Sequence, residues 1–204
     1  MVKHTLILPL TLREKILKFL IENKEFPHSI MEISKRLNVD YKNTFQAFNR
    51  LNPQIYSKKK HGNAYLIEFN PNKRIETINI EGKRAEELLS KNPKLKIIIQ
   101  DIAEINYSFM IVLIFGSFAK GKNTETSDID LCIISDNKLK IKQLTERLNL
   151  LSLKLEIQEF STADFISMIK KRQNNLAHEI VKNNVILYGI ENYYDLVSKW
   201  MKKE

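Results

Sequence analysis

The stretch GSFAKGKNTETSDID, residues 116–130, decides the fold of the second half of the chain. Apolar runs flank it on both sides, at residues 111–115 and 131–134, and each run predicts a buried strand. A glycine–serine turn follows the first strand, and Asp128 and Asp130 lie at the start of the second. Because side chains alternate along a strand, the two aspartates share one face, while Ile129 and Leu131 point into a core on the other.

Two carboxylates on one face repel each other, and this repulsion raises their joint affinity for a divalent cation. Magnesium suits them because it takes oxygen ligands and keeps positions open for phosphate, and two ions can serve one phosphoryl displacement. Gly116 removes a Cβ where the backbone must approach a phosphate, Ser117 adds a hydroxyl donor, and Lys120 offsets phosphate charge. The stretch therefore predicts a site for Mg²⁺, two ions being expected, and a nucleoside triphosphate.

The spacing of Gly116-Ser117, ten residues, then Asp128-x-Asp130 resembles the signature of the DNA polymerase β-like nucleotidyltransferase superfamily. The run most closely resembles the minimal nucleotidyltransferases of prokaryotes, over about residues 95–190. The resemblance implies transfer of a nucleoside monophosphate, with AMP expected, from ATP or another nucleoside triphosphate to a hydroxyl. Some members are antitoxins that place AMP on a tyrosine of a HEPN-type ribonuclease, so a protein partner of that kind is expected.

Two positions depart from the family pattern. Lysine stands at 120 where arginine is common, which keeps the charge and loses the bidentate fork. The family's third carboxylate, usually aspartate on a later strand, is best matched by Glu156, which would act as metal ligand and as general base. The alternative is that Glu156 has no role in the site and is an ordinary solvated side chain on a half-exposed strand.

The first 70 residues show three helical patterns, with Phe45 on the inner face of the third, and then two strand patterns around a basic tip at 59–63. This order resembles a winged helix-turn-helix domain. The resemblance implies contact with duplex DNA through Lys42, Asn43, Gln46 and Arg50 on the third helix and Lys58, Lys59 and Lys60 in the wing. The alternative is a small helical module that contacts only proteins.

Charge and turn residues divide the chain into a predicted winged-helix domain, residues 1–80, and a nucleotidyltransferase domain, residues 81–204. The first part holds 14 basic and 7 acidic side chains, a surplus of seven within a total of +9. The surplus favours a polyanionic partner, or it reflects a lysine-rich proteome. One alternative function is a DNA-binding transcriptional regulator whose second domain senses nucleotide or binds a partner. Another is transfer to RNA or to a small hydroxylated molecule.

The remaining sequence predicts an α/β (α+β) domain with a mixed sheet, in which a helix over residues 138–150 turns Leu139 inward. No apolar run reaches the roughly 20 residues of a membrane span, and no signal-peptide cleavage pattern follows the first ten residues. The single cysteine, Cys132, and four scattered histidines form no zinc-spaced cluster. A cytoplasmic protein without a membrane partner is therefore expected.

Overall fold

The computed structural model describes residues 9–62, 64–171 and 174–198, which form two compact units, 1–69 and 70–204. The boundary between the units lies at 69/70. The predicted domain limit at 80/81 falls inside one continuous helix, α4 (Ile75–Lys91). No helix in the described ranges has the length and apolar character to cross a bilayer.

Unit 1 is a three-helix module beside a small antiparallel sheet with strand order β1-β3-β2. The element order agrees with the sequence prediction, and β1 is an addition to it; identification of the unit as a winged helix-turn-helix domain stays a prediction. Its elements are α1 (Leu12–Glu22), β1 (His28–Ser29), α2 (Ile30–Leu37), α3 (Tyr41–Phe48), the 3₁₀ turn η1 (Pro53–Ile55), β2 (Tyr56–His61) and β3 (Ala64–Phe69).

Two predictions within unit 1 need correction. Phe45 is 40% exposed, because α3 turns only Thr44 and Phe48 fully inward. The lysines at 59 and 60 lie within strand β2, paired with Leu66 and Tyr65, so the hairpin tip is shorter than the sequence indicates. Asn63, the last residue of that predicted tip, lies outside the described residues.

Unit 2 is a four-stranded mixed sheet of order β6-β5-β4-β7, and it confirms the predicted α/β fold. β5 and β6 run parallel, while β4 pairs antiparallel with β5 and β7. Besides α4, its elements are η2 (Pro93–Leu95), α5 (Lys96–Ile105), β4 (Ile111–Ile114), α6 (Gly116–Ala119), β5 (Ile129–Ile134), α7 (Lys138–Asn149), β6 (Leu155–Phe160), α8 (Thr162–Lys170), α9 (Leu176–Lys182), β7 (Val185–Tyr188) and α10 (Ile190–Val197).

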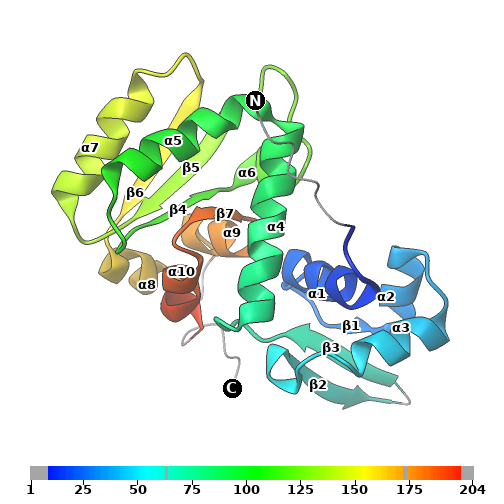
Figure 1. Cartoon of the computed structure of the whole chain (residues 1–204). Coiled ribbons are helices and arrows are strands. Elements are labelled where there is room, and N and C mark those ends of the chain that lie inside the picture. Colours follow the sequence, from blue (N-terminus) through cyan, green and yellow to red (C-terminus); the bar gives the residue numbers. More distant parts are fainter. Residues whose placement is uncertain (1–8, 63, 172–173, 199–204) are drawn as a thin grey trace. The chain divides into compact units, whose positions relative to one another are not determined.

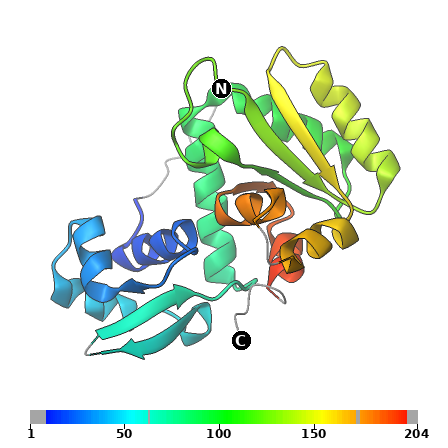
Figure 2. The ribbon, with the colours of Figure 1, turned by 180° about the vertical axis from the view of Figure 1, so that it is seen from behind.

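Helices cover both faces of this sheet (Figures 1 and 2). α5 and α7 pack on the face that carries Ile129, Leu131 and Ile133, and α8, α9 and α10 lie on the opposite face. The second face carries Asp130 and the fully buried Cys132, since they alternate with the first set. Leu139 is 74% exposed, contrary to the sequence prediction, because α7 packs through Ile141, Leu144 and Leu148 instead.

Candidate active site

Just after β4, the backbone of Gly116 lies directly against the side chain of Asp130. We call this contact the interlock of Gly116 and Asp130. The backbone N–H of Phe115 donates to the carbonyl oxygen of Asp130 at 3.0 Å. Gly116 then adopts φ +65°, in the left-handed region that favours glycine. A Cβ at Gly116 would lie 1.8 Å from Oδ2 of Asp130. The missing Cβ thus makes room for the aspartate, a reason that the sequence alone does not reveal.

Asp128 and Asp130 lie together at the start of β5. Asp128 is exposed and precedes the strand, whereas Asp130 is half-buried inside it. Burial raises the pKa of the Asp130 carboxyl, a hydrogen bond from the backbone N–H of Ser117 acts in the opposite direction, and the charge of Asp128 raises that pKa again. The anionic pair is therefore short of positive charge, and a bound cation would stabilise it.

The parallel pairing of β5 with β6 places Glu156 directly beside Asp130 in register. Paired residues of neighbouring strands share a face, so the carboxyls of Asp130 and Glu156 lie on the same side of the sheet. Glu156 is exposed. Within residues 9–62, 64–171 and 174–198, no three His, Cys, Asp or Glu side chains gather closely enough to hold a metal ion. Glu156 as third ligand and base therefore stays a prediction.

The donor set at the start of β5 fits a magnesium ion. Asp128 and Asp130 offer carboxylate oxygens from one face, and magnesium prefers oxygen ligands with positions left for substrate phosphates. Burial and the neighbouring charge of Asp128 raise the pKa of Asp130, and a cation bound at the pair would act against both. These two residues are the ones that would hold the metal.

Lys120 lies on the same side of the site and pairs with a residue that sequence reasoning missed. Its Nζ lies 4.0 Å from Oε2 of Glu179 on α9, and both side chains are 40% or more exposed. The Lys120 charge also lowers the pKa of Asp130. Glu179 is 59 positions further along the chain and carries no local pattern, so only the tertiary structure shows that it meets Lys120.

Hydrogen bonds within the loop after α6 fix its course toward Asp128. The N–H of Lys122 donates to the Ser117 carbonyl at 3.0 Å, and the N–H of Thr124 donates to Oγ of Ser127 at 2.8 Å. Gly121 turns the chain at φ +62°. The two halves of the motif, residues 116–120 and 128–130, are thus held together by local contacts.

The predicted DNA-contacting residues lie in unit 1 and are all exposed. Asn43 is already engaged, because its Nδ2 donates to Oδ2 of Asp40 at 2.5 Å and its N–H is capped by the same carboxylate. The others stand on α3, just after it, or on β2: Lys42, Gln46, Arg50, Lys58, Lys59 and Lys60.

Comparison with known proteins agrees with the geometry of unit 2. Residues 97–193 match the family described as "Polymerase beta, Nucleotidyltransferase". A solved structure described as "Crystal structure of the toxin-antitoxin with AMP-PNP" shares 15% identity, covers 50% of this chain and 81% of its own, and superimposes with a TM-score of 0.34. Among curated proteins, none matches the sequence. The matched residues 97–193 contain Gly116 and Asp130, so the part of the chain that is similar to this family includes the candidate site.

Proposed function

We propose that the chain transfers a nucleoside monophosphate, AMP being the expected one, from a nucleoside triphosphate to a hydroxyl group. The observation that carries this proposal is the interlock of Gly116 with Asp130, which holds a phosphate-sized turn against the half-buried carboxylate of Asp130. A turn used only for packing would not need an aspartate in the space of the missing Cβ. The family match over residues 97–193 supports the same reaction class.

Each site residue has a role in this proposal. Gly116, Ser117 and Lys120 hold the triphosphate, through backbone approach, a hydroxyl donor and a positive charge. Asp128 and Asp130 would hold magnesium, with Glu156 as the proposed third ligand. When bound, magnesium supplies charge neutralisation to the triphosphate and to the pyrophosphate that leaves.

The reaction balances without any further co-reactant. The acceptor hydroxyl oxygen attacks the α-phosphorus, and a new oxygen–phosphorus bond forms. The bond from the α-phosphorus to the bridging oxygen of the β-phosphate breaks, and pyrophosphate leaves with that electron pair. Glu156 takes the hydroxyl proton as general base.

The proposed acceptor is a tyrosine hydroxyl of a HEPN-type ribonuclease partner, for which this chain would be the antitoxin. The support for this acceptor is the likeness of residues 115–131 to minimal nucleotidyltransferases. RNA and small hydroxylated molecules are the competing acceptors, and a nucleotide-sensing regulator is the competing function.

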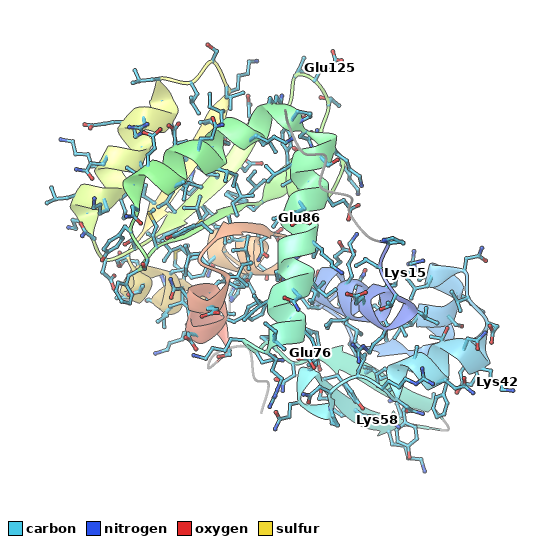
Figure 3. All side chains as sticks on the ribbon, viewed as in Figure 1. Lys15, Lys42, Lys58, Glu76, Glu86 and Glu125 are labelled. Atoms are coloured by element: carbon cyan, nitrogen blue, oxygen red, sulfur yellow. The ribbon has the colours of Figure 1, made fainter. Side chains whose placement is uncertain are left out.

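The test uses ATP labelled at either the α- or the γ-phosphate, in magnesium, with co-purified protein, RNA and small hydroxyl compounds as separate acceptors. We expect α-label in a protein product, released as AMP-tyrosine, and no γ-label. Asp128→Asn and Asp130→Asn should each lower the rate more than about 100-fold, because even outer-shell partners of a metal cost 10–100-fold. Glu125→Gln is the matched control, since Glu125 is an exposed carboxylate at the tip of the same loop (Figure 3).

The other outcomes separate the rival functions. Label on RNA or on a small compound would keep the reaction and replace the acceptor. Nucleotide that binds with no transfer to any acceptor would favour the sensor. A Glu156→Gln variant with an unchanged rate would remove Glu156 from the mechanism, because a general base contributes about 10²–10⁴-fold.

A further inference from the structure

A pocket of about 560 Å³ lies in unit 2, at the end of the sheet opposite to the candidate active site. Its floor is made by Ile111, the first residue of β4, and Ile134, the last residue of β5, which pair with each other in register. Asp130 lies near the other end of β5, and four residues of strand, about 13 Å, separate it from Ile134. This pocket, which we call the β4–β5 pocket, is therefore a place separate from the carboxylate pair.

One wall of the β4–β5 pocket is aromatic and is held in place by hydrogen bonds to its backbone. The rings of Tyr107 and Phe109 line the pocket and meet edge to face, with centroids 6.1 Å apart. Nδ2 of Asn192 donates to the Ser108 carbonyl at 2.6 Å, and Oγ of Ser135 donates to the Phe109 carbonyl at 3.0 Å. Phe109 is nevertheless 74% exposed. The wall is thus an aromatic surface that is fixed in position and open to a ligand.

Two helices close the pocket with apolar side chains. α8 contributes Ile166 and α10 contributes Leu196, both half-buried, and the two helices lie side by side on this face of the sheet (Figure 1). Aromatic and aliphatic side chains therefore make up most of the lining. A volume within about 300–1,000 Å³ and a mostly apolar lining with a few polar groups are typical of sites for small molecules. The pocket has both properties.

The charged groups of the pocket are acidic. Asp136 and Asp195 line it, and within the described ranges no lysine or arginine does, although the whole chain has a formal charge of +9. Oδ2 of Asp136 accepts from the hydroxyl of Thr162 at 2.5 Å, and Oδ1 accepts from the N–H of Thr162 at 2.9 Å. These hydrogen bonds, that of the hydroxyl first, lower the pKa of Asp136. Asp136 therefore keeps its negative charge at neutral pH.

The second carboxylate has one cationic partner, and that partner is exposed. Nζ of Lys73 lies 2.9 Å from Oδ2 of Asp195, and both side chains are more than half exposed. Such a pair is weak in water, so a ligand cation can compete for the carboxylate. Among the described residues, no ion pair involves Asp136. The two carboxylates thus place negative charge at an aromatic pocket, and aromatic faces attract cations as well.

We propose that the β4–β5 pocket binds a small organic cation, namely an ammonium or guanidinium group carried on an aromatic or aliphatic body. The cationic group would lie among Asp136, Asp195 and the aromatic wall, and the body would cover Ile111 and Ile134. The site is separate from nucleotidyl transfer and uses none of residues 116–130.

Singly, each feature of the pocket is ordinary. Exposed apolar residues are common on protein surfaces, and Asp136 also braces the start of α8 through Thr162. The proposal rests on the meeting of an apolar floor, a fixed aromatic wall and two carboxylates in one pocket. A polypeptide partner is less favoured, because a stable interface buries about 800 Å² on each side, whereas these groups meet in one compact pocket.

The experiment titrates the full chain, isotope-labelled at its isoleucine methyl groups, and follows those signals by NMR. Ile111→Val, Ile134→Val and Ile166→Val identify the signals of the pocket. The probes are tryptamine, a cation on an indole body; tryptophol, the neutral alcohol; indole-3-propionate, the anion; and ethylammonium, a cation without the body. We expect tryptamine to shift the pocket signals saturably, with a dissociation constant on the order of 1 mM or tighter. The other three probes should each bind at least about threefold more weakly.

Variants at exposed positions test the two halves of the recognition. Phe109→Ala and Asp195→Asn should each weaken tryptamine binding about 2- to 5-fold, the range expected of exposed cation–π and ion-pair contacts. Lys73→Gln should tighten it about 1.5- to 5-fold, because this change frees Asp195. In an Asp195→Asn background, Lys73→Gln should have no such effect.

Three control variants should bind tryptamine as the wild type does. Leu139→Ala removes an apolar side chain that is also 74% exposed but does not line the pocket. Glu125→Gln removes an exposed carboxylate elsewhere on unit 2, and Asp128→Asn removes one from the candidate active site.

Four outcomes would overturn the proposal. They are the absence of a saturable shift at the pocket signals, binding of tryptophol as tight as that of tryptamine, and normal binding by the Phe109→Ala/Asp195→Asn double variant. The fourth is binding of a tryptophanyl-arginine dipeptide blocked at both ends when tryptamine does not bind, which would assign the pocket to a polypeptide partner instead.

Discussion

Gly116 adopts φ +65° against the carboxylate of Asp130, and Gly121 adopts φ +62° with open space where a Cβ would lie. The two glycines thus share a backbone conformation and differ in their surroundings. Replacing either glycine by alanine should lower the free energy of unfolding by about 1–3 kcal/mol, because alanine disfavours the left-handed backbone conformation. At Gly116 the new methyl must also displace Oδ2 of Asp130, which would move a proposed metal ligand.

We therefore expect Gly116→Ala to lose Mg·ATP binding and to unfold more easily than Gly121→Ala. Gly121→Ala should show only the backbone cost and keep nucleotide affinity within about threefold. Urea unfolding and calorimetric titration with Mg·ATP measure the two effects. Equal behaviour of the two alanine variants would contradict the interlock.

The Lys120–Glu179 pair makes a second prediction at the residue scale. Glu179 competes with the triphosphate for Lys120, so Glu179→Gln should tighten Mg·ATP binding by about 1.5- to 5-fold, the range expected of an exposed pair worth 0.2–1 kcal/mol. In a Lys120→Gln background the same change should have no such effect. A Glu179→Gln effect that persists without Lys120 would show that the two residues act separately.

At the scale of elements, a buried polar network joins α4 to the start of β7 and to α10. Arg84 donates to Oε2 of Glu81 at 2.5 Å and to the carbonyl of Asn184 at 2.7 Å. The hydroxyl of Tyr194 donates to Oε1 of Glu81 at 2.6 Å, and the pKa of Tyr194 is raised well above its usual value, mainly by burial. Both Glu81 and Arg84 are at most 6% exposed. The network ties α4 and α10 to Asn184, the residue just before β7, which pairs with β4.

Removing one member of this network should be costly. Glu81→Gln leaves the Arg84 charge buried without its partner, so we expect a loss of about 3–5 kcal/mol in unfolding free energy. Tyr194→Phe removes one hydrogen bond to a charged group and should cost about 1.5–3 kcal/mol. Urea denaturation measures both. A Glu81→Gln variant as stable as Tyr194→Phe would mean that the pair is not effectively buried.

The same network shows where sequence reasoning ends. The strands predicted from the apolar runs at 111–115 and 131–134 are present as β4 and β5, because apolar runs and turn residues mark them locally. Glu81 and Arg84 lie next to the predicted domain limit at 80/81, and nothing in the sequence there indicates a buried pair, since charged residues usually indicate a solvated surface. Their partners Asn184 and Tyr194 lie about a hundred positions away. The predictions that Leu139 and Phe45 point inward are wrong for a related reason. Short helices pack through a narrow stripe of residues, and periodicity alone does not tell which apolar residue lies outside that stripe.

On the scale of the whole molecule, each unit has its own buried core. Ile16, Leu20, Phe48 and Ile67 are at most 1% exposed in unit 1, and Leu113, Leu131 and Leu144 are fully buried in unit 2. Separate cores allow separate unfolding transitions. The motif at 116–130 explains why unit 2 should respond to nucleotide, and the winged-helix resemblance of unit 1 leads to the expectation that duplex DNA acts on unit 1 alone.

Calorimetry should therefore resolve two transitions with different ligands. A non-hydrolysable ATP analogue with magnesium, at about 100 times its dissociation constant, should stabilise unit 2 by about 2.7 kcal/mol and leave the other transition in place. The duplex should shift only the transition of unit 1. One transition moved equally by both ligands would show that the units unfold together.

The claim on which the rest depends is that residues 116–130 form a magnesium-dependent nucleotide site. Isothermal titration of ATP into the full chain, with and without Mg²⁺, tests it directly in wild type, Asp128→Asn, Asp130→Asn and Glu125→Gln. We predict saturable one-to-one binding that requires Mg²⁺ in wild type and Glu125→Gln and is lost in both aspartate variants. ATP binding of equal strength without Mg²⁺, or in the aspartate variants, would contradict the account.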